Sequence, residues 1–429
     1  NWARNIEYSN ARFHKPDSVA ALQSIVRDSD RVRALGSRHS FSRCADTEGD
    51  LVQLGSLPRC VSIENRVATC SAGTTYADLC DDIEASGWGL HAMASLPHLT
   101  VAGAIATATH GSGDRLGNLT TAVAGIEYVG ADGELRTLEA GDDRLQAVIL
   151  GSLGIITKVS LKVERFFLVR QDVYLDLPWS SIEGHFDSIM GEAYSVSIFL
   201  DWSAGGAQQL WLKRKVEPQF VSIMPPALPS FLGASLAAHA VHPVPGMDAE
   251  CCTEQGEPAG PWSQRLSHFR ADREPSGHGD ELQSEYFVAR KDAIAALKAV
   301  RELHEHITPL LLVSEIRSMA ADDWWLSPCY GQASVGLHFT WKHDYDAVLT
   351  VLPKIERALA PFGVRPHWGK LFTLGPDHLD AVFPRMAEYR ELVTTLDPQG
   401  KFRNDFTERL IFGKDEVASS FPKPKDEEE

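Results

Sequence analysis

The chain has 429 residues, of which 44% are hydrophobic and 23% are charged, and this composition indicates a globular protein of two or three domains. Its formal net charge of -17 argues against nucleic acid and anionic membranes as partners, because both repel an acidic surface. The chain has no stretch apolar enough to span a bilayer and no signal-peptide pattern at Asn1-Trp2-Ala3. We therefore expect a cytoplasmic protein, and we expect a monomer.

The first third of the chain alternates short helices and strands. Pro16-Asp17-Ser18 predicts the start of a helix whose apolar stripe continues to Val26. A strand over 31–35 follows and ends at Gly36. The other predicted elements of this part are a helix over 76–85, a hairpin over 126–138 with an Asp-Gly turn, and strands over 50–54, 66–70 and 155–163.

Longer β-like runs begin near residue 166. The predicted strands are 168–177, 194–202, 208–215, 282–288, 310–319 and 335–341, and the predicted helices are 291–304 and 344–359. Residues 217–261 are rich in Pro, Gly, Ala and Met, which predicts an irregular excursion with one or two short helices. Long paired strands alternating with helices predict an α+β arrangement on an antiparallel sheet.

The cysteine pattern does not indicate a disulfide framework. The count of seven is odd, and no Cys-x-x-Cys pair occurs. We interpret these residues as mostly buried or free thiols in a reducing compartment. They are Cys44, Cys60, Cys70, Cys80, Cys251, Cys252 and Cys329. No His-Glu-x-x-His or comparable ligand cluster appears, so the sequence predicts no metal site.

Three segments, 35–41, 102–113 and 150–156, are unusually rich in small residues. Small side chains let the backbone approach a bulky ligand closely. The alternative for the first segment is a tight turn with a solvent-facing His39. The alternative for the second is a flexible linker, although Ile105 makes it rather apolar for one.

Further motifs follow one another along nearly the whole chain. They are Asn1-Trp2-Ala3, Met93-Ala94-Ser95-Leu96-Pro97-His98, Val241-His242-Pro243-Val244-Pro245-Gly246-Met247, Pro366-His367-Trp368-Gly369-Lys370 and Asp397-Pro398-Gln399-Gly400-Lys401-Phe402. With the three small-residue segments, they resemble the vanillyl-alcohol-oxidase-type flavoproteins, and within them the alditol oxidase (xylitol oxidase) group. Each motif is a modest signal, but their order and spacing together are highly specific.

The resemblance implies a two-domain α+β fold of the FAD-linked oxidase type. An FAD-binding domain over 1–165 would be completed by 372–415. A substrate-binding cap domain over 166–371 would hold a large antiparallel sheet covered by helices. The acidic run within 416–429 is expected to be a disordered tail.

The resemblance also implies FAD as the cofactor, bonded covalently to His39 through the flavin 8α carbon. Arg38 stands where the group often has Gly, so its side chain must point away from the flavin or pair with an acidic neighbour. The other residues implied to bind the cofactor are Gly36, Ser37, Ser40, Ser95, Thr100, Gly103, Thr107, Thr109, His110, Ile156, His367 and Lys370, together with Arg38 itself.

Ionisable residues placed two apart on a buried strand share one face of a sheet. Glu315 and Arg317 fit this pattern, and so do His338 and Thr340, while Lys370 follows Trp368-Gly369. Taken singly, each is more typical of a structural ion pair or a satisfied core histidine than of a catalytic group.

The resemblance changes that balance, because the matching positions line the substrate pocket in alditol oxidases. The residues implied to hold the polyol hydroxyls are Ser95, Glu315, Arg317 and Thr340. His338 and Lys370 would flank the reacting carbinol, with His367 near the flavin. We expect Arg317 and Lys370 to stabilise developing negative charge, and His338 to accept the proton with Lys370 as its rival.

The leading hypothesis is therefore an FAD-dependent polyol oxidase. It would oxidise a terminal hydroxyl to an aldehyde by hydride transfer to flavin N5 and reduce O2 to hydrogen peroxide. A pocket of this polarity suits xylitol or sorbitol and would reject an apolar aromatic alcohol. The alternatives are a sugar-1,4-lactone oxidase or dehydrogenase of the same superfamily, and a flavin-storing carrier protein without turnover.

Overall fold

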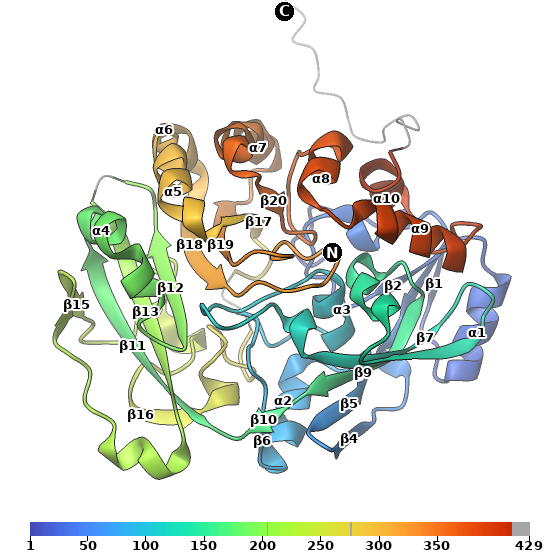
Figure 1. Cartoon of the computed structure of the whole chain (residues 1–429), viewed down its shortest axis with the longest axis horizontal. Coiled ribbons are helices and arrows are strands. Elements are labelled where there is room, and N and C mark those ends of the chain that lie inside the picture. Colours follow the sequence, from blue (N-terminus) through green and yellow to red (C-terminus); the bar gives the residue numbers. More distant parts are fainter. Residues whose placement is uncertain (204, 275–276, 414–429) are drawn as a thin grey trace, which may run out of the picture.

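The structure is a computed structural model that describes residues 1–203, 205–274 and 277–413. The N-terminal part lies on one side of the molecule, and a large β-sheet with its own helices lies on the other (Figure 1). This combination of helices with a large antiparallel sheet confirms the α+β class predicted from the sequence.

Two small sheets and a strand pair form the framework of the N-terminal part. The first sheet is parallel and has the order β1 (Arg12–His14), β3 (Asp50–Gln53), β2 (Val32–Leu35). The second is antiparallel and has the order β4 (Val61–Glu64), β5 (Val67–Ser71), β9 (Ile155–Lys162), β7 (Val123–Val129), β8 (Leu135–Glu139). The pair consists of β6 (Trp88–Gly89) and β10 (Glu164–Arg165).

Side-chain caps explain where two helices of this part begin. Ser18 precedes α1 (Val19–Asp28), and Thr75 precedes α2 (Tyr76–Ala85); each hydroxyl accepts a hydrogen bond from a backbone N–H of the first turn. Both helices agree with the sequence prediction. A third, α3 (Val101–Ala106), forms within the second small-residue segment, where no helix was predicted.

One ten-stranded antiparallel sheet dominates the rest of the molecule. Its order is β14 (Ser230–Phe231), β15 (Ala234–Leu236), β11 (Leu168–Leu177), β13 (Ala207–Val216), β12 (Ser195–Leu200), β18 (Leu311–Met319), β19 (Ser334–Lys342), β17 (Glu281–Ala289), β20 (Arg365–Pro366), with β16 (Gly256–Pro261) also paired to β11. The helices beside it are α4 (Trp179–Met190), α5 (Ala293–Arg301), α6 (His304–Ile307) and α7 (Tyr345–Leu359) (Figure 1).

Side chains alternate between the two faces of this sheet. In β19, Leu337, Phe339 and Trp341 pack into the hydrophobic core beneath the helices. His338 and Thr340 lie between them in the chain and line a cavity on the other face. The alternation therefore separates the residues that hold the sheet to its helices from the residues that are free to meet a ligand.

Two segments differ in detail from their prediction. The excursion over 217–261 forms short 3-10 turns at Pro218–Ile223 and Ala249–Cys251 and adds three short strands to the sheet. The helix predicted over 291–304 ends at Arg301, because Leu303 leaves the helical conformation before α6 begins.

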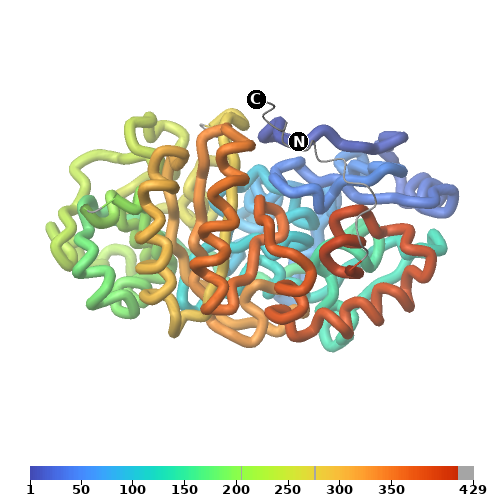
Figure 2. Tube along the Cα trace, turned by 90° about the horizontal axis from the view of Figure 1, so that it is seen from above, coloured from blue at the N-terminus to red at the C-terminus, as the bar shows by residue number. Residues whose placement is uncertain are grey.

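The C-terminal helices pack beside the N-terminal part, as the two perpendicular views agree (Figures 1 and 2). They are α8 (Pro376–Val382), α9 (Met386–Leu396) and α10 (Asp405–Leu410). The hydroxyl of Tyr389 donates to the carbonyl of Ile149 at 3.0 Å, and both residues belong to one hydrophobic core. The domain division at 165 and 371 stays a prediction, and Trp324 and Trp325, inside the predicted cap, pack into this same core. The predicted tail over 416–429 lies outside the described residues.

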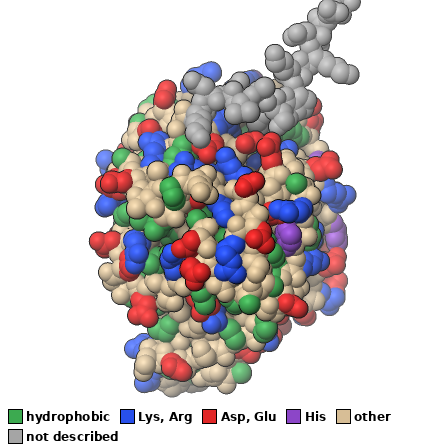
Figure 3. Space-filling model, turned by 90° about the vertical axis from the view of Figure 1, so that its right-hand side faces the viewer, with side chains coloured by type: hydrophobic (Ala, Val, Ile, Leu, Met, Phe, Trp, Pro, Cys, Tyr) green, Lys and Arg blue, Asp and Glu red, His purple; other side chains and the backbone are tan. Residues whose placement is uncertain are grey.

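Acidic and basic side chains alternate over the face in Figure 3, with hydrophobic side chains scattered among them. Among the described helices, none combines the length and the apolar character that crossing a bilayer needs. All seven cysteines are free thiols; Cys60 is exposed, Cys251 is half-buried and the other five are buried.

Candidate active site

One cavity of about 750 Å³ brings the predicted site residues together. The three small-residue segments line one part of it, and strands β17, β18 and β19 line another. Every residue that the sequence assigned to the cofactor or to the substrate lies on its wall. Their individual roles stay predictions, because position alone does not assign chemistry.

Bare backbone forms one wall of the cavity. A Cβ atom on Gly36 would lie 2.5 Å from the Thr100 hydroxyl oxygen, and one on Gly103 would lie 2.7 Å from the same atom. Ser37 accepts a hydrogen bond from the backbone N–H of Thr100 at 3.2 Å, which joins the first segment to the second. Arg38 has a φ of 66°, a left-handed conformation that favours glycine, and this agrees with the glycine often found there in the related group.

His39 follows on the same wall. Its ring lies against Trp2 with the centroids 5.1 Å apart. Its Nδ1 atom is buried and has no hydrogen-bond partner among the residues that the structure describes. Burial lowers the pKa of His39 to about 4, so the imidazole is neutral at neutral pH and keeps a lone pair.

Three neighbouring strands present ionisable groups in one row. Glu315 of β18 is the register partner of His338 of β19, which is in turn the register partner of Glu285 of β17. Arg317 lies two residues beyond Glu315 and therefore on the same face. The register of the sheet thus assembles a row that the order of residues along the chain does not reveal.

Glu285 is the centre of this row, and the sequence analysis did not identify it. Its carboxylate is completely buried and accepts hydrogen bonds from Arg317 at 2.8 Å and from Lys370 at 2.6 Å. The Nε2 atom of His110 lies 3.2 Å from the same carboxylate. Burial alone would raise the pKa of Glu285, but Arg317 and Lys370 outweigh it and hold the pKa well below its usual value.

Glu315 has a second partner that the sequence did not indicate. His268 approaches its carboxylate at 2.8 Å, and the guanidinium of Arg317 lies 3.5 Å away. Burial works against the charged form, but Arg317 and His268 together lower the pKa of Glu315. Two buried carboxylates, Glu285 and Glu315, are therefore balanced by the cations of Arg317 and Lys370.

A short chain of side chains sets the tautomer of His338. Gln283 donates its amide N–H to Glu281 at 2.8 Å, so its carbonyl oxygen faces Nε2 of His338 at 3.1 Å. Nε2 must then carry the proton, and Nδ1 keeps the lone pair. Burial, reinforced by Lys370, holds the pKa of His338 well below its usual value, so the ring is neutral.

A periodic signal would have found part of what was missed. Glu281 and Glu285 lie four residues apart on β17 and therefore share one face, so a search for ionisable residues that allowed a spacing of four as well as two would have selected Glu285. His268 offers no such signal, because it lies outside the described strands and reaches the site only through the tertiary fold.

The wall residues fit an FAD molecule. Close backbone approach, a cavity of about 750 Å³ and a buried His39 Nδ1 that has no hydrogen-bond partner within the described part of the chain are features that suit a large flat cofactor tethered through an imidazole. His367 accepts the backbone N–H of Gly369 on Nδ1 at 3.1 Å, which leaves its Nε2–H as a donor.

Comparison with known proteins agrees with this geometry. The FAD binding domain family model matches residues 11–139, and the D-arabinono-1,4-lactone oxidase model matches residues 280–410. An alditol oxidase from a Streptomyces species is 41% identical, over 96% of this chain and 99% of its own length. The chain belongs to the alditol oxidase family of FAD-dependent oxidoreductases.

More distant relatives place this alditol oxidase family member within a wider fold group. An L-gulono-1,4-lactone dehydrogenase of Mycobacterium tuberculosis is 26% identical over 96% of this chain and 98% of its own length. The crystal structure of cholesterol oxidase from B. sterolicum has a TM-score of 0.76 at 14% identity, covering 93% of this chain and 94% of that one. The latter likeness shows the shared fold alone.

Proposed function

We propose that this protein oxidises the terminal hydroxyl of a small polyol, such as xylitol or sorbitol, to the aldehyde and passes the electrons to O2, giving hydrogen peroxide. The observation that carries the proposal is the buried row of Glu315, Arg317 and His338 facing a cavity that also holds Thr340 and Ser95. A polyol has many hydroxyl groups for few carbons, and this wall offers a hydrogen-bonding group for several of them.

FAD, when bound, supplies the acceptor for the hydride at its N5 atom. We assign its covalent attachment to His39, supported by the neutral ring of that residue and by its Nδ1, which meets no hydrogen-bond partner in residues 1–203, 205–274 and 277–413. The backbone of Gly36 and Gly103 would lie against it, and the Nε2–H of His367 would donate to it. A covalent tether keeps the cofactor in place through every turnover.

His338 is the proposed proton acceptor. Its Nδ1 atom carries the lone pair and lacks a hydrogen-bond partner among the described residues. Lys370 is the weaker candidate, because its ammonium pairs with Glu285 at 2.6 Å, and this carboxylate opposes loss of the proton. Burial lowers the pKa of Lys370, and Glu285 works against that shift. We assign Lys370 and Arg317 to stabilising the negative charge that develops on the substrate oxygen.

The experiment that tests the proposal compares substrates. Purified enzyme is mixed anaerobically with xylitol, sorbitol or an aldono-1,4-lactone, and bleaching of the flavin is followed. Peroxide release is then measured in air. We expect fast bleaching and stoichiometric peroxide with the polyols. Bleaching by the lactone alone would assign the protein to the lactone oxidases, and no bleaching by any substrate would favour a flavin carrier.

The covalent link is tested separately by precipitating the protein in acid. Flavin that stays with the pellet is covalently bound, and flavin in the supernatant is not. We expect yellow pellets from the wild type and colourless pellets from His39→Ala. A yellow His39→Ala pellet would assign the link to another residue.

A further inference from the structure

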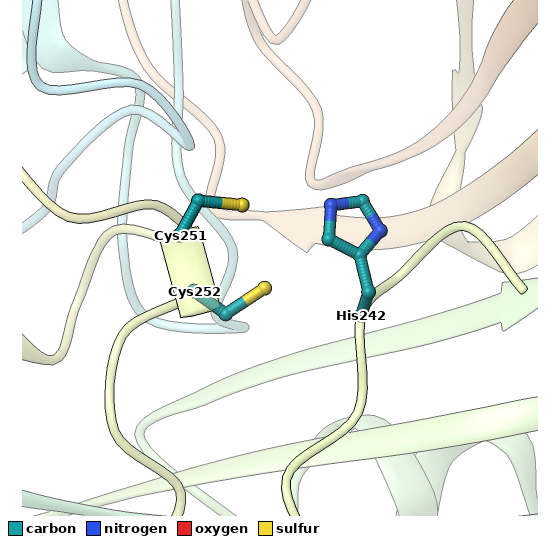
Figure 4. Close-up of side chains that lie close together, drawn as sticks. All are labelled: His242, Cys251 and Cys252. Atoms are coloured by element: carbon teal, nitrogen blue, oxygen red, sulfur yellow. The ribbon is translucent and has the colours of Figure 1, made fainter. Parts of the chain in front are cut away.

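A cluster of soft ligands lies outside the catalytic row, in the excursion between β13 and β17. The ligand atoms of His242, Cys251 and Cys252 all lie within 4.8 Å of one another. Both sulfur atoms point toward the imidazole, whose Nε2 atom is on the side of the sulfurs (Figure 4). His242 is 3% exposed and Cys252 is 5% exposed, so the cluster is largely shielded from solvent.

We propose that His242, Cys251 and Cys252 form a binding site for one thiophilic divalent cation, of which Zn²⁺ is the representative. Two thiolates and one imidazole are a ligand set that this class of ion prefers, with a fourth position left for water. A tetrahedral zinc ion holds its sulfurs about 3.8 Å apart, given Zn–S bonds of about 2.3 Å. The ligands therefore need to close by only about 1 Å.

Hydrogen bonds fix the backbone of the two segments that carry the ligands. The carbonyl of His242 accepts a hydrogen bond from Gln209 at 2.7 Å, and Gln255 bonds both the N–H and the carbonyl of Val241. On the other side, the carbonyl of Cys251 accepts the N–H of Arg270 at 2.9 Å. Metal affinity benefits when the backbone carrying the ligands is already fixed.

The histidine can take the tautomer that a metal requires. The Nδ1 atom of His242 lies 2.9 Å from the N–H of Val244 and 3.3 Å from the carbonyl of the same residue. In this structure Nδ1 accepts the N–H of Val244; with an ion on Nε2 it would instead carry the proton and donate to the carbonyl, as metal-bound histidines commonly do through the nitrogen that does not bind the ion.

Charge balance also fits the environment. Cys252 belongs to a small hydrophobic cluster with Val173, Phe199, Trp211 and Val313. A net charge would be costly there. Two thiolates and one divalent cation sum to zero, so the loaded site buries no net charge, and loading releases two protons. His242 also lines the cavity of the candidate active site. The ion would therefore fix the position of the segment between β13 and β17, which forms part of the cavity wall.

Zinc content of the folded enzyme is the direct test, and it does not depend on turnover. Enzyme with bound FAD and with its cysteines kept as thiols is equilibrated with ZnCl2. Unbound ion is removed by gel filtration, and the zinc content is measured by inductively coupled plasma mass spectrometry. We expect about one zinc ion per chain in the wild type and in the control Cys60→Ser, whose thiol is exposed and is not part of the cluster. We expect less than about a tenth of that in Cys251→Ser and Cys252→Ser.

A second measurement needs no variant and remains decisive if Cys252→Ser fails to fold. Wild-type enzyme is alkylated with iodoacetamide in the presence of zinc or of EDTA, and the labelled cysteines are located by mass spectrometry. Zinc should protect the half-buried Cys251 and leave Cys60 reactive. A wild type without zinc, variants that retain it, or equal labelling of Cys251 under both conditions would overturn the proposal.

Discussion

At the scale of single residues, the site is a balance of buried charges centred on Glu285. The carboxylate holds Arg317 and Lys370 at 2.8 and 2.6 Å, so it fixes the positions of both cations that face the cavity. Without it the two buried cations would repel one another, so that Lys370 would lose its proton or the two side chains would move apart. Glu285 is therefore a positioning residue for Arg317 and Lys370 in the proposed reaction.

The substitution Glu285→Gln should impair both stability and rate. It keeps the shape of the side chain but leaves one positive charge of the buried row uncompensated, because Glu315 still faces Arg317, and this costs about 3–5 kcal/mol of unfolding free energy. We also expect anaerobic flavin reduction by xylitol to slow by about 100-fold. The control is Glu356→Gln, another buried carboxylate, whose partners are the neutral Tyr286 and Thr373. Equal rates in the two variants would contradict the role of Glu285.

His338 should give a characteristic pH profile. Because burial lowers its pKa well below the usual value, the ring stays unprotonated as the pH falls through the normal histidine range. The value of kcat/KM should therefore stay level from about pH 8 to about pH 6 and fall only at lower pH. A loss centred near about pH 6.5 would contradict this. In His338→Ala, near-normal flavin reduction would remove the residue from the role of proton acceptor.

At the scale of secondary-structure elements, strand β13 supports the substrate pocket through a buried lysine. Lys213 is 1% exposed and donates to the backbone carbonyls of Arg265, Leu266 and Ser267 at 2.6 to 2.8 Å. The next residue is His268, which bonds Glu315, and its N–H donates to the carbonyl of Ser95 at 3.1 Å. One ammonium group thus fixes a segment that touches two predicted substrate-binding residues.

Replacing this lysine should loosen the segment more than it alters the chemistry. We expect Lys213→Met to cost about 1–3 kcal/mol for the carbonyls left unpaired, and to raise KM for the polyol about 10-fold with a smaller change in kcat. Lys298→Met is the control, because that lysine forms an exposed ion pair with Glu183 and should cost at most about 1 kcal/mol. An unchanged KM in Lys213→Met would show that β13 does not support the pocket.

At the scale of the whole molecule, the cavity is lined by segments that are anchored in the two largest hydrophobic cores. One core contains the N-terminal sheets and the C-terminal helices, and the other lies between the large sheet and its helices. A cofactor that fills this cavity would contact segments anchored in each core, so its binding energy would stabilise both.

Thermal unfolding should test both the stabilisation by bound FAD and the proposed covalent bond to His39. In His39→Ala the cofactor can dissociate, so adding free FAD to about 100 times its Kd should stabilise the protein by about 2.7 kcal/mol and raise its Tm. We propose that the wild type holds its flavin covalently, so we expect its Tm not to respond to added FAD. Identical responses of the two proteins would argue against a bond to His39.

The sequence by itself determined the class of fold and most of the site. Strands with a period of two and capped helices such as the one at Ser18 are local signals, and they predicted the long strands of the large sheet and helices such as α1, α2 and α7. Helices α4, α8, α9 and α10 were not predicted. The two-residue spacing of Glu315 and Arg317 places both on one strand face whatever the rest of the chain does. The motifs carried the family resemblance for the same reason, since they are read along the chain.

Only the tertiary structure decided which groups pair across strands. The register of β17, β18 and β19 brings Glu285 beside Arg317, and the fold of an irregular segment brings His268 to Glu315. The same irregular fold gathers His242, Cys251 and Cys252 from positions whose spacing matches no metal motif. Contacts of this kind depend on register and loop path, and these are set by packing over the whole chain rather than by any local pattern.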